Sequence, residues 1–252
     1  MCSKEIIKSN IRMNRRKFIK AGSLISFGFL FLSKVNYSKT LYDFIDSVDD
    51  FKEKIIQLLI ELKREGSSLV RKIMMGKEYV YDPYTHYPYD GGIKDENSGY
   101  QLFFHAHRPN EYGHFHTFAK DENGDLIHLI LISMNEDGIP IVLATVNRWV
   151  TGDKFVKANT LNQYADKFFV NPELFEDNRV VKFINYIFKA YSKEINSLFE
   201  QRDEWISKYV MDNYREPFED RDHEIISYIK INVKEKLHEK FSKDEIFIDI
   251  RN

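Results

Sequence analysis

The chain has 252 residues, 43% of them hydrophobic and including 20 Phe and 15 Tyr, which is enough to build the core of one domain and excludes a disordered chain. Lys and Arg number 37 against 39 Asp and Glu, but residues 1–39 hold nine of the basic residues and one of the acidic ones. The remainder therefore has 28 basic and 38 acidic residues, a formal charge of −10 (28 − 38). Such an acidic domain is a poor match for nucleic-acid phosphates, so no nucleic-acid partner is expected.

The N-terminal segment combines paired arginines with a short apolar run. Residues 13–20 read MNRRKFIK, and AGSLISFGFLFL follows at 21–32. This pattern resembles a twin-arginine (Tat) export signal, although Asn14 stands where Ser or Thr is usual. The apolar run is too short to cross about 30 Å of hydrocarbon as a helix, so no stable membrane span is predicted. The alternative is a short amphipathic anchor or a buried helix.

These features predict a signal segment at residues 1–39 and a single domain at 40–252. The Tat export machinery is the expected partner of residues 13–32. The protein is expected in the periplasm or exported by the Tat pathway, and membrane-attached if the signal is not cleaved. Met13 is an alternative start. Cys2, the only cysteine, precedes the apolar run, so the exported domain would need no disulfide.

Residues 41–64 predict an amphipathic helix that ends near Gly66. Its apolar residues recur at spacings of three and four: Phe44, Val48, Phe51, Ile55, Leu58, Leu59 and Leu62. The tyrosine-rich stretch YVYDPYTHYPYDGG at 79–92 predicts an ordered loop. That loop either lines a pocket, with Tyr89 as a ligand-binding residue, or covers an edge of the core.

The middle of the chain predicts an antiparallel meander of about four strands. Residues 100–107 alternate between two faces, and 114–119, 125–134 and 139–149 are rich in Ile, Leu, Val and Phe. Asn123-Gly124 and the stretch from Asn135 to Gly138 are turn signals between them.

The C-terminal part predicts helices. Asn171-Pro172-Glu173 is typical of a helix start, and an apolar stripe then runs from 180 to 198 and on through Trp205 and Tyr209. Residues 223–241 are charged and predict a further helix, with a short strand at 246–250. We therefore expect an α+β fold in which the meander packs against N- and C-terminal helices.

Four histidines fall in the stretch FFHAHRPNEYGHFHTF at 103–118: His105, His107, His114 and His116. If His107 pairs with His114 across a hairpin, His105 pairs with His116, because both index sums are 221 (107 + 114 and 105 + 116). All four rings would then share one face of the sheet. This spacing predicts a site for a divalent transition metal, whose identity the sequence does not give.

Other polar residues are expected around this cluster. Glu111, in the hairpin loop, would be a general base or a ligand, and His86 and Asp90 come from the preceding loop. The face of His128 depends on the turn before it: a two-residue turn places it on the far face, and a three-residue turn closing Asp121 on Asp125 places it with the cluster.

Two other interpretations of the cluster remain open. The face could be a hydrogen-bonded structural network or the solvated side of the sheet. Residues 99–111 also fit the pattern G-x5-H-x-H-x3-E, which is similar to the first motif of cupins, where such residues bind iron or manganese. Phe118 stands where that motif has Gly, and the second cupin motif is missing.

A second polar stretch, ISMNEDGIPIVLATVNRWVTGD, covers residues 132–153. Arg148 would bind an anionic substrate or pair with Glu111, as a catalytic residue. Asn147 and Trp149 are candidate ligand-binding residues, although Trp149 could equally seal the core.

These blocks together resemble an uncharacterised bacterial family of domains of unknown function. The resemblance rests on HYPYD at 86–90, on the HAH…ExGHFHTF block at 105–118 and on the NRWVTG block at 147–152, and it covers about residues 42–205. It implies one domain in which the blocks lie near each other, and it brings no activity with it.

The sequence therefore supports three hypotheses. The first is an exported metal-dependent enzyme, the second a non-catalytic module that binds metal or a small ligand, and the third a structural histidine network without metal. The chain has no nucleophile elbow, P-loop, dinucleotide-binding glycine pattern or cysteine pair, which argues against the enzyme classes that need them.

Overall fold

The structure is a computed structural model that describes residues 47–209, 216–233 and 235. The predicted Tat segment, the early part of the first predicted helix and the predicted strand at 246–250 lie outside these residues. Within them, no helix combines the length and the apolar character that crossing a membrane would require.

The centre of the fold is a seven-stranded sheet in which every pairing is antiparallel. Its strands are β1 (Asp82–Tyr87), β2 (Ile93–Asp95), β3 (Tyr100–Ala106), β4 (Gly113–Lys120), β5 (Leu126–Met134), β6 (Pro140–Val146) and β7 (Ile225–Lys230). Their order is β1-β3-β4-β5-β6-β7, and β2 shares the outer edge of β3 with β1. The predicted meander is β3 to β6, because short turns join these four strands in chain order.

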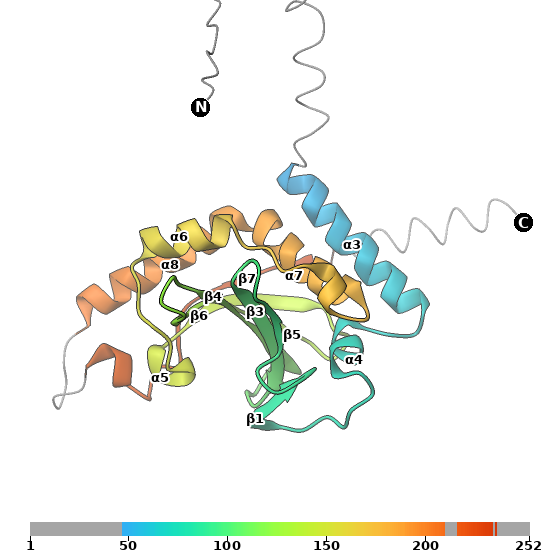
Figure 1. Cartoon of the computed structure of the whole chain (residues 1–252), viewed down its shortest axis with the longest axis horizontal. Coiled ribbons are helices and arrows are strands. Elements are labelled where there is room, and N and C mark those ends of the chain that lie inside the picture. Colours follow the sequence, from blue (N-terminus) through green and yellow to red (C-terminus); the bar gives the residue numbers. More distant parts are fainter. Residues whose placement is uncertain (1–46, 210–215, 234, 236–252) are drawn as a thin grey trace, which may run out of the picture. The chain divides into compact units, whose positions relative to one another are not determined.

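Helices cover one face of this sheet. They are α3 (Val48–Arg64), α4 (Leu69–Met74), α6 (Ala158–Asp166), α7 (Asn178–Ala190) and α8 (Ser192–Lys208). Figure 1 shows α3, α6, α7 and α8 on one side of the sheet, and the short helix α5 (Arg148–Thr151) on the other. The α+β class with N- and C-terminal helices against an antiparallel sheet is thus confirmed.

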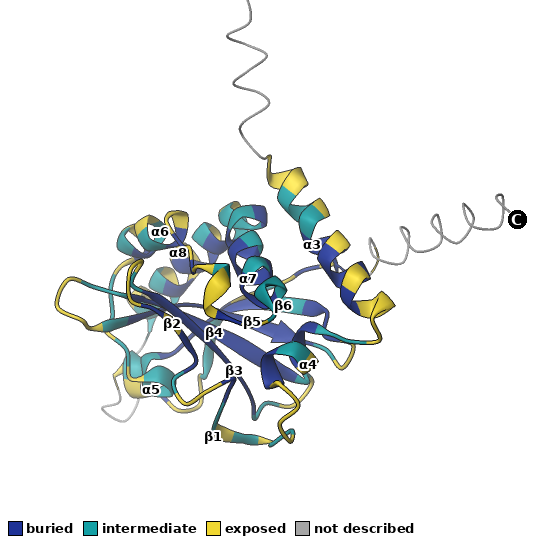
Figure 2. Cartoon of the chain, turned by 45° about the vertical axis from the view of Figure 1, so that its right-hand side comes forward, coloured by how far each residue is buried: buried dark blue, intermediate teal, exposed yellow. Residues whose placement is uncertain are grey.

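The core lies between the helices and the sheet. Leu102, Phe104 and Phe115 alternate with the histidines along β3 and β4 and are fully buried. Phe115 meets Phe183 of α7 with 6.5 Å between ring centroids. In Figure 2 the central strands β3, β4 and β5 are almost entirely coloured as buried, so both faces of the sheet centre are covered. The histidine face is therefore part of the protein interior and not a solvated surface.

The first helix ends where the sequence predicts. Ser47 and Asp50 form a capping box at the start of α3, and Gly66 follows its last turn with φ +66°. The later part of the apolar stripe faces the core, since its residues Ile55, Leu58, Leu59 and Leu62 are buried, whereas Val48 is exposed.

Two strands lie where the sequence predicted other structure. The tyrosine-rich loop contains β1, which pairs with β3 only at Asp82↔Ala106 and Tyr87↔Phe104, so it has little regular pairing to leave an alternating pattern. The predicted helix at 223–241 is wrong at its start, where β7 extends the sheet beside β6. Ser227 anchors this strand, because its buried hydroxyl contacts Thr145 Oγ1 at 2.6 Å and donates to the Leu198 carbonyl at 2.8 Å.

The C-terminal stripe is divided between two helices. Asn171 caps only a short 3-10 turn, η1 (Pro172–Leu174), and α7 begins after Asp177, whose carboxylate accepts from the Arg179 N–H. The chain leaves helical geometry at Tyr191, with φ −123° and ψ 27°, and α8 follows at once. The apolar period alone does not reveal this break, since both helices turn their stripes toward the same core.

Candidate metal centre

The hairpin of β3 and β4 places the histidines on the face opposite the helices. His105 pairs with His114, and Phe103 pairs with His116, so the index sum is 219 and the predicted sum of 221 is wrong by two residues. The loop between the strands causes this difference in register. β3 ends at Ala106, so His107 lies outside the strand. Asn110 then adopts φ 67°, and the Tyr112 N–H donates to the Met134 carbonyl. A shift of two residues preserves the side-chain alternation, so the shared face is retained.

Three histidine nitrogens converge at the centre of this face. Nε2 of His114 lies 2.7 Å from Nε2 of His105 and 3.1 Å from Nε2 of His116. All three residues are at most 5% exposed. His107 is half-buried at the side of the group, with its ring centroid 4.6 Å from that of His105 and 5.1 Å from that of His114. Ligand atoms of His105, His107 and His114 all lie within 4.8 Å of one another, so these side chains could hold a metal ion.

Glu111 contacts the other nitrogen of His114. Its carboxylate lies against Nδ1 of that ring at very short range, and the carboxylate side chain is only 4% exposed. The Arg108 guanidinium lies 3.8 Å away on the outer side. Glu111 thus occupies the position of a partner that orients a histidine. In the cupin-like interpretation Glu111 would itself be a metal ligand.

The contacts of His114 cannot all be hydrogen bonds. A neutral imidazole has one N–H and one lone pair. If His114 donates its proton from Nδ1 to Glu111, its Nε2 has a single lone pair facing two other Nε2 atoms. One of these neighbours can donate to it, and the second contact is then left without a bonding partner. A cation bound by the three lone pairs would resolve the conflict.

Burial strongly disfavours protonation of the histidines in the cluster. It lowers the pKa of His105 to about 2, with the His114 and His107 rings adding to the effect. Burial likewise holds the pKa of His114 and of His116 well below the usual range. Burial also raises the pKa of Glu111, against the opposing influence of Ser133 and Arg108. The imidazoles are therefore neutral near neutral pH, which is the form that binds metal.

His128 lies on the same face as the cluster. A three-residue turn closes Asp121 on Asp125, with the Asp121 N–H donating to the Asp125 carbonyl at 3.0 Å, and Phe118 pairs with His128. This is the second of the two alternatives that the sequence left open. Nε2 of His128 lies 2.8 Å from Nδ1 of His116, and the residue is 5% exposed.

His86 borders the cluster on the β1 side. Its ring stacks on Phe103 at 4.1 Å and is 5.5 Å from that of His105. Its Nδ1 is buried without a hydrogen bond and lies 3.7 Å from the Asp90 carboxylate. Phe103 thereby lies between His86 and His116, and His86 lines the edge of the site.

The contacts of the other sequence-predicted site residues are with residues other than His105, His107, His114 and His116. Asn147 caps α5 and donates to the Pro217 carbonyl at 2.8 Å. Arg148 pairs with Glu219 at 2.7 Å, and Trp149 donates to the His223 carbonyl. Tyr89 is 46% exposed. The arginine beside Glu111 is Arg108, which the sequence did not single out because nothing in its spacing distinguishes it from other surface cations.

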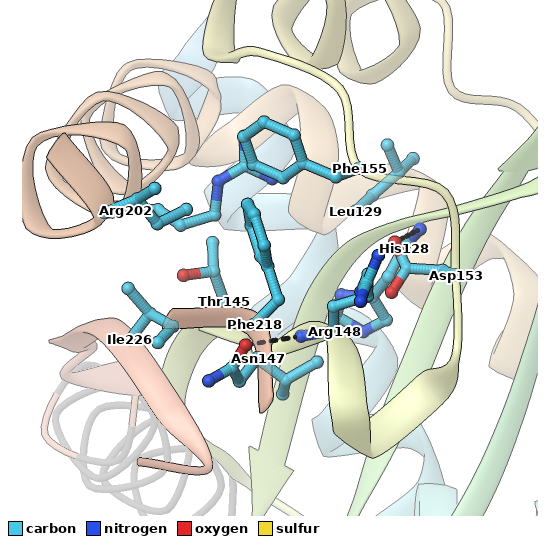
Figure 3. Close-up of a pocket in the computed structure, with 12 residues that line it drawn as sticks. His128, Leu129, Thr145, Asn147, Arg148, Asp153, Phe155, Arg202, Phe218 and Ile226 are labelled. Carbon is cyan, nitrogen blue, oxygen red and sulfur yellow. Dashed lines mark hydrogen bonds between the residues drawn. The ribbon is translucent and has the colours of Figure 1, made fainter. Parts of the chain in front are cut away.

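The NRWVTGD stretch instead holds the strand that carries His128. The Asp153 carboxylate accepts from the backbone N–H of His128 at 3.0 Å and from the Thr151 hydroxyl at 2.5 Å. A cavity of about 20 Å³, room for about one water molecule, lies beside His128 (Figure 3). Its lining includes Asn147, Arg148, Asp153 and the buried Arg202, while Phe155 and Phe218 meet above it at 4.8 Å. The two sequence blocks therefore meet at His128.

Comparison with known proteins gives a family and no activity. No curated protein and no solved structure matches the chain. The family described as "Domain of unknown function (DUF6969)" matches residues 49–231, a span that includes every strand and helix named above except the first residue of α3. The chain therefore belongs to the DUF6969 family of domains of unknown function.

Proposed function

We propose that the protein binds one divalent transition-metal ion through Nε2 of His105, His114 and His116, with His107 beside them. The proposal rests on one observation: two neighbouring Nε2 atoms lie 2.7 and 3.1 Å from Nε2 of His114, whose Nδ1 is already engaged by Glu111. Around a tetrahedral ion with metal–nitrogen bonds near 2.1 Å, nitrogens lie about 3.4 Å apart. The nitrogens of the His114–His105 and His114–His116 pairs need to separate by about 0.7 and 0.3 Å to reach that spacing (3.4 − 2.7 and 3.4 − 3.1).

The chemistry of the donor set supports an ion such as zinc, cobalt or iron. Imidazole suits these metals, and the described residues of the centre include no thiolate. The carboxylate–histidine contact of Glu111 is the arrangement by which proteins orient a metal-ligating ring and raise its basicity. Glu111 thus supports binding from behind a ligand.

A metal-dependent enzyme and a binding module differ in whether the ion has an exchangeable position. Whether His107 binds the ion determines whether such a position exists. Its half-buried ring stands at the outer side of the centre, so it could complete a closed four-histidine site or leave room for water beside a three-histidine one. We favour the open arrangement, since His107 lies beyond the end of β3 and is not fixed by sheet pairing.

A reconstitution experiment tests the metal site. Full-length protein stripped with a chelator is dialysed against zinc, cobalt or ferrous iron and its metal content is measured. We expect about one ion per chain in the wild type and in His223→Ala, a control at a histidine outside the cluster. We expect none in His114→Phe. A wild-type protein that takes up no ion, or a His114→Phe variant that takes up as much, would show that the cluster is a structural network.

Azide addition to the cobalt-loaded protein then separates enzyme from module. An open position predicts a change in the visible spectrum as azide binds the ion. An unchanged spectrum would indicate a closed site and a binding module.

A further inference from the structure

His128 stands directly behind His116. Nε2 of His128 is 2.8 Å from Nδ1 of His116, the ring centroids are 5.0 Å apart, and both residues are almost completely buried. This distance fits one N–H···N hydrogen bond. Unlike the crowded Nε2 of His114, this contact can be fully satisfied with one proton.

A β-bulge brings His128 to this position. From Gly113 to His116 the paired indices of β4 and β5 sum to 247, a register in which residue 128 would face Ala119 on the helix side. From Phe118 onward the sum is 246, so two residues of β5, 129 and 130, oppose Thr117 alone. The bulge reverses the direction of His128 and places it on the histidine face.

Neighbouring side chains stabilise the bulge. The Thr117 hydroxyl donates to the Ile130 carbonyl at 2.8 Å and accepts from the Ile130 N–H at 3.1 Å, which satisfies both backbone groups of the bulged residue. Asp153 accepts from the N–H of His128 itself at 3.0 Å. Thr117 and Asp153, which come from the two sequence blocks, thus help to place His128 against Nδ1 of His116.

We infer that His128 is a positioning residue for the metal centre, which it serves by accepting the Nδ1 proton of His116. The inference rests on the proposed metal site. If Nε2 of His116 binds the ion with its lone pair, its proton must be on Nδ1, and Nε2 of His128 must then be the unprotonated acceptor. The hydrogen bond fixes the tautomer and the orientation of His116 and raises its basicity as a ligand.

Substitution at His128 tests this role through zinc affinity measured by competition with a chelating dye. His128→Phe keeps the ring volume and removes the acceptor, so we expect zinc binding to weaken about 10- to 100-fold. In His128→Gln the amide oxygen takes the place of Nε2, so we expect most of the affinity to return. His223→Phe, at a half-exposed histidine outside the histidine cluster, should leave the zinc affinity unchanged.

The outcomes separate the two proposals. Wild-type protein without zinc binding would end the metal-site proposal and this inference with it. Wild type and His128→Phe binding zinc equally well would end this inference alone. Nitrogen NMR of zinc-loaded wild type decides the matter even if the variants fail to fold: we expect a proton on Nδ1 of His116 and none on Nε2 of His128. The opposite assignment would overturn the inference.

Discussion

The buried histidines predict a steep loss of stability in mild acid for the metal-free protein. His105, His114, His116 and His128 are all at most 5% exposed. Burial lowers the pKa of His105 to about 2 and that of His128 to about 3, and it lowers the pKa of the other two well below the usual range. A histidine with a lowered pKa binds fewer protons folded than unfolded. Its stability contribution is therefore present above the unfolded pKa of about 6.5 and is lost as pH falls below it.

The magnitude follows from the number of rings. Between about pH 7 and about pH 5.5, each histidine that stays neutral only in the folded state lowers the free energy of unfolding by roughly 1.3 kcal/mol. Four such residues lower it by about 5 kcal/mol, a large share of the 5 to 15 kcal/mol that is typical of a domain.

Urea unfolding with chelator present measures this change. The free energy of unfolding should fall by about 4 to 5 kcal/mol across that pH range, and the replacement of His128 by Phe should reduce the fall by about a quarter. A fall of less than about 1 kcal/mol in the wild type would refute the reasoning, because it would mean that the folded cluster accepts protons as readily as the unfolded chain.

Three further predictions concern substitutions with defined outcomes. Glu111→Leu should weaken zinc binding about 10- to 100-fold in a dye competition, because the carboxylate acceptor of His114 is lost; unchanged affinity would contradict its orienting role. Thr117→Val should lower the free energy of unfolding by about 1 to 3 kcal/mol, since it leaves two buried backbone groups of Ile130 unpaired, and a stability equal to wild type would count against the bulge as described. Gly92→Ala should destabilise more than Gly124→Ala in thermal unfolding. Both glycines have positive φ, but a Cβ at Gly92 would lie 2.1 Å from a backbone oxygen and one at Gly124 meets nothing, so equal effects would show that backbone strain alone decides.

The histidine face was predictable because strand alternation depends only on parity. Any even shift of the β3–β4 register keeps His105, His114 and His116 on one side, so an error of two residues in the pairing left the conclusion intact. The register itself was not predictable, since it depends on how Glu111 and Asn110 fold the loop. A carboxylate that turns back onto His114 has no signature in a single sequence.

The position of His128 depends on a turn and a bulge together. The Asn-Gly signal predicts a turn without giving its length, and neither Thr117 nor Ile130 is an unusual residue for a strand. The role of the NRWVTGD stretch was not predictable for a related reason. Its side chains cap α5 and hold β5, and local periodicity does not reveal such tertiary contacts. Asn147 and Arg148 make contacts that stabilise the fold, and their predicted ligand-binding and catalytic roles stay predictions.

X-ray absorption spectroscopy of the zinc-loaded wild-type protein tests the central claim most directly, because it reports the atoms that surround the ion. The account predicts three or four nitrogens at about 2.0 to 2.1 Å, with the outer-shell scattering of imidazole rings. Loss of the imidazole signal in His114→Phe should accompany loss of bound zinc. A first shell of oxygens without imidazole scattering would place the ion elsewhere and contradict a metal centre built on the histidine face.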